Sequence, residues 1–302
     1  MHWRRLGLVW KPSGHHPALL THAALPVGFD LGGDLARIFF SGRDASNRSS
    51  IGSLVLRLGD APRVEEVAPQ PVLTPGAIGS FDDAGCGMGC VVRHPQGDRI
   101  YYMGWNVGGS VPWRNAIGLA VGDAAAGRFE RYSAGPIMDR DTVDPYTLSY
   151  PCVLRLGPAD WRMWYGTSLA WSAELSEMHH VLRAARSVDG IHWQRGSGLV
   201  LAPQSDEIAL VRPSIVLGAG GAEMWFARRT ARPYRLGHAR SADLETWLRD
   251  DDALLEPQPD GWEGGAVTYP GVFDAAGRRW LLYNGQGYGA GGIGLAVWEP
   301  GE

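Results

Sequence analysis

Cysteine is scarce in this 302-residue sequence, which contains three: Cys86, Cys90 and Cys152. A small, odd number cannot build a disulfide framework and is typical of a reducing compartment. Cys86 and Cys90 lie close together, but no second cysteine pair or histidine pair follows them at the spacing of a zinc site. We therefore expect buried thiols, and we expect neither a metal ion nor a cofactor.

Long apolar segments are also absent. No run approaches the roughly 18 apolar residues that a membrane-spanning helix needs. The two arginines near the N-terminus, Arg4 and Arg5, are not followed by the apolar core of a signal peptide. The sequence therefore predicts a cytoplasmic protein without a membrane partner.

Neither sign of charge dominates, because 28 Lys and Arg stand against 32 Asp and Glu, a net charge of −4. No basic stripe is present, which argues against a nucleic-acid partner. Apolar residues make up 45% of the chain, and 42 glycines and 20 prolines supply turns. This composition is typical of a globular protein with a large core.

What the sequence does contain is an internal repeat. An apolar strand pattern ending in small residues recurs about every 60 residues. The third position of this pattern is always aromatic: Phe40, Tyr102, Tyr165, Phe226 and Tyr283. A steady period of this length indicates a repeat architecture, and most of these aromatic residues should be core. We expect Tyr102, Trp164, Tyr165, Trp225 and Tyr283 to be buried.

Each repeat contains further strands in step with this one. An earlier strand is entered near Pro26, Gly89, Pro151, Pro213 and Pro270, a third strand follows the aromatic one, and most repeats end in a fourth. The last repeat lacks the fourth strand, but residues 2–12 resemble residues 192–203 of the third repeat. We therefore predict one all-β domain over residues 1–302, a five-bladed β-propeller of four-stranded antiparallel blades whose ring the N-terminal strand closes.

Acidic residues precede the first strand of four repeats. Asp82, Asp144, Asp206 and Glu263 each stand seven residues before the strand entry, and Asp83 and Glu207 are their neighbours. The first strands of a propeller line its central channel, so these acids are candidates for a ring at the channel mouth. Crowded carboxylates can have their pKa values pushed apart, as acid and base catalysis requires. Ordinary turn residues or strand caps are the alternative.

Aromatic and polar residues follow the second strands or flank the first. Aromatic side chains with fixed polar neighbours suit a sugar ring, and arginines suit an anionic group or an ion pair between blades. The candidates for substrate binding are His22, Arg43, Asp44, Trp105, Asn106, Arg114, Trp171, Arg212, Arg229 and Tyr288.

Two other motifs predict no site. The glycine-rich segment 287–292 fits a dinucleotide-binding pattern, but a strand rather than a helix follows it, so we interpret it as a hairpin. The pairs His15–His16 and His179–His180 lack metal-ligand spacing, and we expect them in loops or facing solvent.

The whole chain resembles the five-bladed propeller glycosidase superfamily, which includes arabinanases, xylosidases, invertase-like enzymes and mannoside phosphorylases. The resemblance lies in the blade motifs at residues 101–105, 162–167, 187–193 and 293–296. More narrowly, residues 144–146, 212–213, 261–263 and 283–285 look like those of propeller proteins found among bacterial surface-polysaccharide genes.

The resemblance implies three carboxylates: a base or nucleophile from the first blade, an orienting Asp from the second and a proton donor from a later blade. The first repeat departs from this pattern, because no acid precedes Pro26 and His22 is nearest to the expected place. Asp144 is a replacement base, and His22 or Asp44 could also fill the role.

The two remaining roles fall to residues of later repeats. Asp82 or Asp83 matches the orienting residue, and Glu207 or Glu263 could donate the proton. The catalytic candidates are thus Asp82, Asp83, Asp144, Glu207 and Glu263. We expect a carbohydrate-active protein, foremost a glycoside hydrolase acting on a carbohydrate or a sugar-containing small molecule. The alternatives are a non-catalytic glycan-binding propeller and a sugar phosphorylase or transferase of surface-polysaccharide metabolism.

Overall fold

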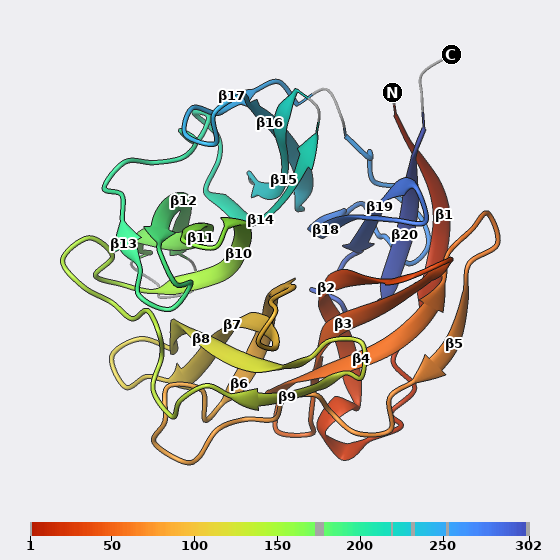
Figure 1. The fold of residues 1–302 in the computed structure, drawn as a ribbon, viewed down its shortest axis with the longest axis horizontal. Helices are drawn as coiled ribbons and strands as arrows, with labels where there is room; N and C mark the ends of the chain where they lie inside the picture. Colours follow the sequence, from red (N-terminus) through yellow and green to blue (C-terminus); the bar gives the residue numbers. More distant parts are fainter. Residues whose placement is uncertain (1, 173–177, 219, 231–232, 252–253, 300–302) are drawn as a thin grey trace.

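The computed structural model describes residues 2–172, 178–218, 220–230, 233–251 and 254–299. Within these ranges the chain is all-β, with twenty strands and a single short 3-10 turn, η1 (Pro17–Leu19). The sheets stand around a central axis, which Figure 1 views end on. Within the same ranges, no helix has the length and apolar character to cross a lipid bilayer.

The strands form three hydrogen-bonded sheets. One has four strands in the order β1-β20-β19-β18, and the other two have eight strands each. Each eight-stranded sheet is joined across its middle by one parallel residue pair, Ser49 with Gly85 in the first and His180 with Ala209 in the second. The bounds of strands β1 to β10 are His2–Trp10, Thr21–Gly32, Leu35–Arg43, Ser49–Arg57, Arg63–Val67, Gly85–Val92, Asp98–Val107, Trp113–Asp123, Arg128–Arg131 and Leu148–Gly157. Those of β11 to β20 are Asp160–Trp171, Met178–Ser187, Gln194–Arg195, Ala209–Gly218, Gly221–Arg229, Arg235–Ser241, Leu248–Arg249, Thr268–Ala275, Arg278–Asn284 and Ile293–Glu299.

On either side of these single pairs, consecutive strands are antiparallel. The groups β2–β5, β6–β9, β10–β13 and β14–β17 each pair first to second, second to third and third to fourth. The first strands contact one another in the cyclic order β2, β6, β10, β14, β18 and back to β2. This radial arrangement of sheets is that of a β-propeller.

The N-terminal strand β1 completes the sheet that contains the last strands of the chain. It runs antiparallel to β20, from His2 opposite Glu299 to Trp10 opposite Ile293. The sequence predicts this pairing from the likeness of residues 2–12 to the end of the third repeat. Both ends of the chain therefore lie at one sheet, as Figure 1 shows, and β1 covers the edge that β20 would otherwise expose.

The repeated aromatic residue of each second strand packs across the third strand. In four repeats its partner is a glycine: Phe40 lies opposite Gly52, Tyr102 opposite Gly118, Phe226 opposite Gly237 and Tyr283 opposite Gly294. A β-carbon on Gly118 would lie 2.3 Å from Cζ of Tyr102, so the missing side chain is what lets the ring lie flat on the strand. In the third repeat Arg183 stands opposite Tyr165 instead.

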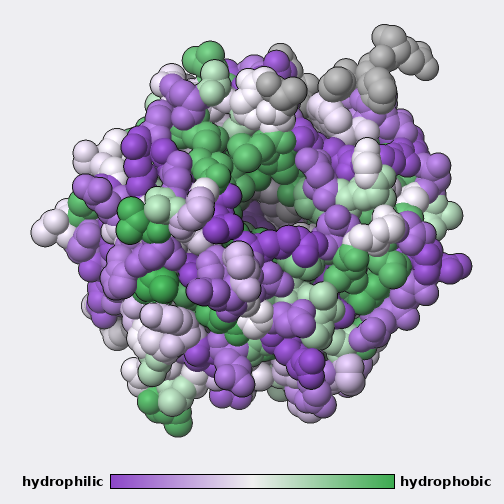
Figure 2. Space-filling model, viewed as in Figure 1, coloured by the Kyte–Doolittle hydropathy of each residue, from purple (hydrophilic) through white to green (hydrophobic). Residues whose placement is uncertain are grey.

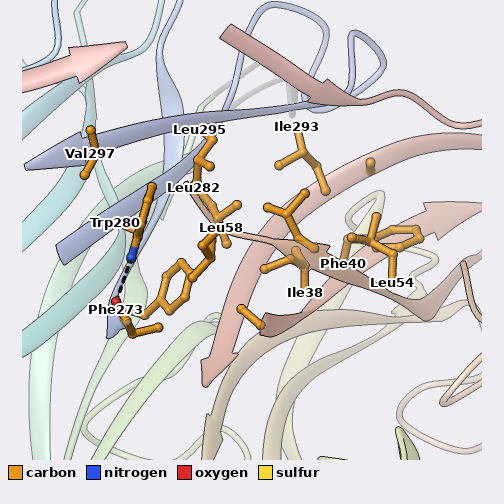
Figure 3. Close-up of a cluster of buried hydrophobic side chains, with 14 of the residues drawn as sticks. Ile38, Phe40, Leu54, Leu58, Phe273, Trp280, Leu282, Ile293, Leu295 and Val297 are labelled. Atoms are coloured by element: carbon orange, nitrogen blue, oxygen red, sulfur yellow. Dashed lines mark hydrogen bonds between the residues drawn. The ribbon is translucent and has the colours of Figure 1, made fainter. Parts of the chain in front are cut away.

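Part of the core lies between neighbouring sheets. One cluster joins Ile38, Phe40 and Leu54 of the first group to Trp280 and Leu295 of the last sheet, and Figure 3 shows these side chains meeting between the two sheets. The indole of Trp280 donates a hydrogen bond to the carbonyl of Ala275, 2.9 Å away. The five aromatic residues predicted as core are buried: Tyr102, Trp164, Tyr165, Trp225 and Tyr283. Cys86 and Cys152 are buried thiols as predicted, and Cys90 is partly covered.

Candidate functional site

A cavity of about 480 Å³ lies where the sheets meet at the axis, and strands of every sheet supply its wall. Figure 2 shows the central hollow on one face, bordered mostly by hydrophilic residues. Its volume falls within the usual range for small-molecule sites, roughly 300–1,000 Å³. The wall consists of Ala24, Leu25, Ser41, Arg43, Asn47, Ser49, Gly87, Met103, Trp105, Trp113, Asn115, Tyr150, Met178, His180, Arg229, Tyr234, Tyr269 and Tyr288.

A repeated backbone feature directs side chains toward the axis. Leu25, Tyr150, Arg212 and Tyr269 occupy equivalent places in four first strands, have φ values of 56°, 50°, 56° and 51°, and each precedes a proline. The ladder register shifts at each of these places. Left-handed backbone is costly for such residues, and the position before proline favours an extended one. Strain of this kind gathers at functional sites, and three of these side chains line the cavity.

Four tyrosines form one wall of the cavity. The ring of Tyr269 lies 6.0 Å from that of Tyr150, 6.4 Å from that of Tyr234 and 6.4 Å from that of Tyr288. Burial raises the pKa of Tyr150, and it raises the pKa of Tyr269 well above its ordinary value. Both phenols therefore stay neutral and offer hydroxyl donors and acceptors at physiological pH.

Further polar groups of the wall come from the first and third groups of strands. Arg43 donates from Nη1 to the side-chain oxygen of Asn47, 2.8 Å away. Nδ1 of His180 lies 3.3 Å from the hydroxyl of Ser168. Burial lowers the pKa of His180 to about 4, and the charge of Arg229 acts in the same direction. His180 is thus a neutral hydrogen-bonding group at pH 7.

Arg212 lies fully buried among the first strands. Its Nη1 donates to the carbonyl of Gly89 at 2.6 Å, and its Nη2 lies 3.4 Å from the carbonyl of Pro26. Its Nε has no hydrogen-bond partner. These contacts tie the fourth group of strands to the first two, so Arg212 is an internal brace rather than an open binding group.

The predicted acids have different surroundings. Asp82 is 1% exposed and accepts hydrogen bonds from the hydroxyl of Tyr102 at 3.0 Å and from Nε of Arg131 at 2.8 Å. Asp144 is fully buried and accepts from Tyr165 at 2.7 Å and from Arg195 at 3.1 Å. In both cases the tyrosine comes from the second strand of the group and the arginine from the fourth.

The same arrangement recurs at the other two acids. Glu263 accepts from the hydroxyl of Tyr283 and from Nε of Arg5, both at 2.8 Å. Glu207 accepts two hydrogen bonds from Arg249, at 2.6 and 2.8 Å, and the guanidinium of Arg249 also lies over the ring of Phe226, which replaces the tyrosine. Burial alone would raise the pKa of Glu207. The hydrogen bonds from Arg249 and from the backbone amide of Gln204, together with the charges of Arg249 and Arg228, outweigh burial and hold the pKa below its ordinary value.

We call this recurring contact the acid–arginine clasp: Asp82 with Arg131, Asp144 with Arg195, Glu207 with Arg249 and Glu263 with Arg5. The expected ring of acids sharing one mouth is therefore corrected by the structure. Each carboxylate is enclosed by its own arginine and does not line the central cavity. The neighbours differ: Asp83 accepts from the backbone amide of Gly79, and Asp206 is exposed. A catalytic role for these acids stays a prediction.

The predicted binding residues are only partly brought together. Arg43, Trp105, Arg229 and Tyr288 line the cavity. Trp171 is not part of the wall, but its ring lies 5.2 Å from that of the wall residue Trp113.

The other predicted binding residues lie outside the wall. His22 is close enough to Arg43 that burial and this positive charge lower its pKa. Asp44 is held by Arg48 at 2.9 Å, Asn106 pairs with Arg114 across two strands, and Arg114 donates to the hydroxyl of Ser110. Arg212 lies beneath the wall as an internal brace.

Some wall residues are not among those predicted from the sequence. His180 lines the cavity, which corrects the expectation that both histidines of its pair face solvent; its neighbour His179 is exposed. Tyr150 and Tyr269 were missed as well. Their signal is the repeat itself, because each occupies the place before the proline that opens the first strand. Within the described ranges, no group of three or more His, Cys, Asp or Glu residues is arranged to hold a metal ion.

Solved structures share this fold at low sequence identity, and no protein-family model matches the chain. A structure of BT0996 described as an RGII complex has a TM-score of 0.77 at 18% identity and covers 98% of this protein and 91% of its own length. A glycosyl hydrolase from Bacteroides ovatus has a TM-score of 0.69 at 16% identity, covering 97% and 94%. A third structure has a TM-score of 0.68 at 15% identity and also covers 97% of this protein and 94% of its own length. Its description states that the GH130 family of mannoside phosphorylases contains glycoside hydrolases that target β-1,2 mannosidic linkages in Candida mannan. These likenesses establish the propeller fold.

Two relatives from Mycobacterium tuberculosis match over nearly the entire length. The uncharacterized proteins Rv1502, from strain H37Rv, and MT1551, from strain CDC 1551, are each 44% identical over 301 residues, which is 99% of this chain and 100% of theirs. Identity of this extent over both full lengths shows a common family. The chain therefore belongs to the same protein family as Rv1502 and MT1551, and its fold is a β-propeller with a cavity at the axis.

Proposed function

We propose that this protein is a five-bladed propeller that binds a carbohydrate in its central cavity. The observation that carries the proposal is the wall of that cavity, where Trp105, Trp113 and four tyrosines stand among hydroxyl, amide and guanidinium groups. A sugar ring presents an apolar face and hydroxyl edges, so it needs both kinds of group at once.

The blade count follows from how the strands are grouped. A single residue pair joins the halves of each eight-stranded sheet, whereas antiparallel pairs run the length of the strands within each half. Each half is one blade in this interpretation, and the sheet β1-β20-β19-β18 is the fifth. The cyclic contacts of the five first strands support the same count.

The cavity favours binding without glycoside cleavage. Cleavage of a glycosidic bond generally needs two carboxyl groups about 5 to 10 Å apart that flank it. Among the described wall residues there is no Asp or Glu. Four of the five acids expected to supply this chemistry are held in the acid–arginine clasps, and the fifth, Asp83, accepts a hydrogen bond from the backbone amide of Gly79. A non-catalytic glycan-binding propeller is therefore the primary proposal.

The direct test is a binding screen of the full chain against a panel of mono- and oligosaccharides, read by saturation-transfer NMR and calorimetry. The double substitution Trp113→Ala and Tyr288→Ala removes two wall residues and should abolish binding. Tyr132→Ala is the matched control, since Tyr132 is 51% exposed, close to the 48% of Tyr288, and lies outside the cavity. Binding that survives in the double variant, or no binding to any sugar, contradicts the proposal.

Glycoside hydrolysis or phosphorolysis is the second candidate, favoured by the fold shared with glycoside hydrolases and a mannoside phosphorylase family. In it, Asp144 activates water or phosphate, Glu207 or Glu263 donates the proton and Asp82 or Asp83 tunes the donor. Incubation with aryl glycosides, with and without inorganic phosphate, and with nucleotide sugars separates hydrolysis, phosphorolysis and transfer. Turnover that is lost in Asp144→Asn at equal concentration of folded protein would support this candidate over binding alone.

A further inference from the structure

Two positive charges at the cavity, those of Arg43 and Arg212, are not balanced by carboxylates of the described residues. Arg43 lies in the wall and hydrogen-bonds to the neutral side chain of Asn47. Asp44, its neighbour in sequence, forms an ion pair with Arg48 and accepts hydrogen bonds from the backbone amides of Ser46 and Arg48. Arg43 therefore presents a guanidinium to the cavity that the adjacent acid does not neutralise.

Arg212 adds the second charge at greater depth. Its hydrogen bonds go to two backbone carbonyls, those of Gly89 and Pro26, and it forms no ion pair with a described residue. Buried charges are ordinarily paired, because removing an ion from water is costly. This side chain is 2% exposed and has an unbonded Nε, so its charge is only partly compensated.

The ionisable groups whose charges would act on Arg212 do not supply an anion. They are the thiols of Cys90 and Cys152 and the phenols of Tyr150 and Tyr269. Burial raises the pKa of Cys90 and Tyr269, and it raises the pKa of Cys152 to about 11. All of them are neutral at physiological pH, and the arginine stays charged.

Tyr150 links the two arginines to the cavity. It lines the wall, and its phenol is influenced by the charges of both Arg212 and Arg43. Two cations near one hydroxyl give this part of the cavity a positive potential, because the surrounding protein reduces the screening of each charge by water. A neutral sugar would gain little from this field, whereas an anionic group would gain charge-assisted hydrogen bonds.

We infer that the central cavity takes a sugar carrying an anionic group, a carboxylate or a phosphate, with Arg43 as the contacting residue and Arg212 as the fixed positive charge beneath it. This inference rests on the proposed function, since it names the ligand class of the same cavity. The aromatic wall holds the ring of the sugar, and the guanidinium fork of Arg43 binds the paired oxygens of the anion.

The test compares matched sugars by calorimetry on the full chain at low ionic strength. Each set contains a neutral hexose, its uronate and its 6-phosphate, for glucose, galactose and mannose. The anionic members should bind about tenfold tighter or more than the neutral one, as expected for hydrogen bonds to a charged group. Added sodium chloride should narrow that difference. Whichever of the uronate and the phosphate binds more tightly identifies the source of the charge.

Variants locate the effect. Arg43→Gln should weaken anionic binding about tenfold more than it weakens neutral binding, because glutamine keeps a hydrogen-bonding amide but loses the charge. Arg63→Gln is the control, because its side chain is 68% exposed and pairs with Glu65 away from the cavity. Arg212→Met should also reduce the preference for anions, and if this variant does not fold, Arg43→Gln decides alone.

The outcomes separate the inference from the proposed function. Neutral sugars that bind as tightly as their anionic partners, or an anionic preference that persists in Arg43→Gln, overturn the inference while the carbohydrate-binding function stands. Absence of binding by every member of every set overturns both.

Discussion

Left-handed backbone at residues other than glycine is concentrated around the cavity. Of the ten such residues in the described part of the chain, with φ values between 50° and 65°, five line the cavity: Leu25, Asn47, Tyr150, Tyr269 and Tyr288. His22 and Arg212 lie next to the wall, and Leu244, Asp251 and Ala276 lie elsewhere. At four of the ten the following proline makes the conformation more costly still. A fold tolerates such strain where the direction of the side chain matters more than local stability. In this protein the strained positions direct tyrosine and arginine side chains to the axis.

Asp144 at the centre of its clasp should be a stabilising residue. In Asp144→Asn, Arg195 and Arg183 lose a charged partner although their side chains are only 10% and 13% exposed. We expect the free energy of unfolding to fall by about 3 kcal/mol, the scale of breaking a buried pair. Denaturant unfolding of the variant measures it.

Asp206→Asn provides the control for this prediction. Asp206 also stands seven residues before a strand entry, but it is exposed, so its replacement should change stability by less than about 0.5 kcal/mol. Equal stability of Asp144→Asn and the wild type would show that the clasp is not a structural element.

His180 gives a pH-dependent prediction. Since its pKa is lowered to about 4, the folded protein holds it neutral while the unfolded chain protonates it below about 6.5. The unfolded state then binds more protons between these values, so this residue makes stability fall as pH drops from about 6.5 toward 4. An NMR titration assigned with His180→Ala should show an imidazole midpoint near 4, and a midpoint above about 6 would contradict the burial of this side chain.

At the scale of elements, the pairing of an aromatic ring with a glycine explains why the repeat is visible in the sequence. Small residues follow the second-strand aromatic, and a glycine stands opposite it in four repeats. In the third repeat Arg183 takes that place and lies 3.5 Å from Asp144, which accepts the hydroxyl hydrogen of Tyr165. Two turns between strands also follow from the local sequence, because Asp189 and Asp243 accept hydrogen bonds from the backbone amides of the residues two and three positions later.

Gly118→Ala tests the ring-on-glycine contact. Its methyl group would lie 2.3 Å from Cζ and 2.7 Å from the hydroxyl oxygen of the buried Tyr102, which in turn hydrogen-bonds to Asp82. Overpacking of this kind costs about 1–3 kcal/mol of stability. Gly109→Ala is the matched change, because nothing lies within 4 Å of the place that its methyl group would take. Thermal unfolding of both variants should show a lower Tm for Gly118→Ala alone.

At the scale of the whole molecule, the sheet β1-β20-β19-β18 unites the two ends of the chain. Arg5 of β1 supplies the arginine of the last clasp, as Arg131, Arg195 and Arg249 do in other groups. In the last sheet, β1 thus occupies the place that the fourth strand has in the other groups. The inter-sheet core of Figure 3 then joins this sheet to the first group.

Arg5→Gln should therefore destabilise the molecule more than Arg4→Gln. Arg5 pairs with the fully buried Glu263, whereas Arg4 pairs with Glu299 and Asp60 at the surface. The first change leaves a buried carboxylate without its cation and should cost about 3 kcal/mol, and the second should cost less than about 1 kcal/mol. Urea unfolding distinguishes them, and an equal loss in both variants would contradict the role assigned to β1.

The sequence alone determined the repeat, the all-β class, the strand places, the core aromatics and the partner of the N-terminal strand, because these depend on local periodicity and on patterns that recur along the chain. It also located Arg43, Trp105, Arg229 and Tyr288. Which polar groups lie together depends on how the blades pack. The equal spacing of the four acids predicts equivalent positions, but arginines of the outer strands enclose them and keep them out of the cavity wall. The wall contains residues such as Tyr150 and His180 instead, and these meet at the axis because of backbone strain and the packing of the blades.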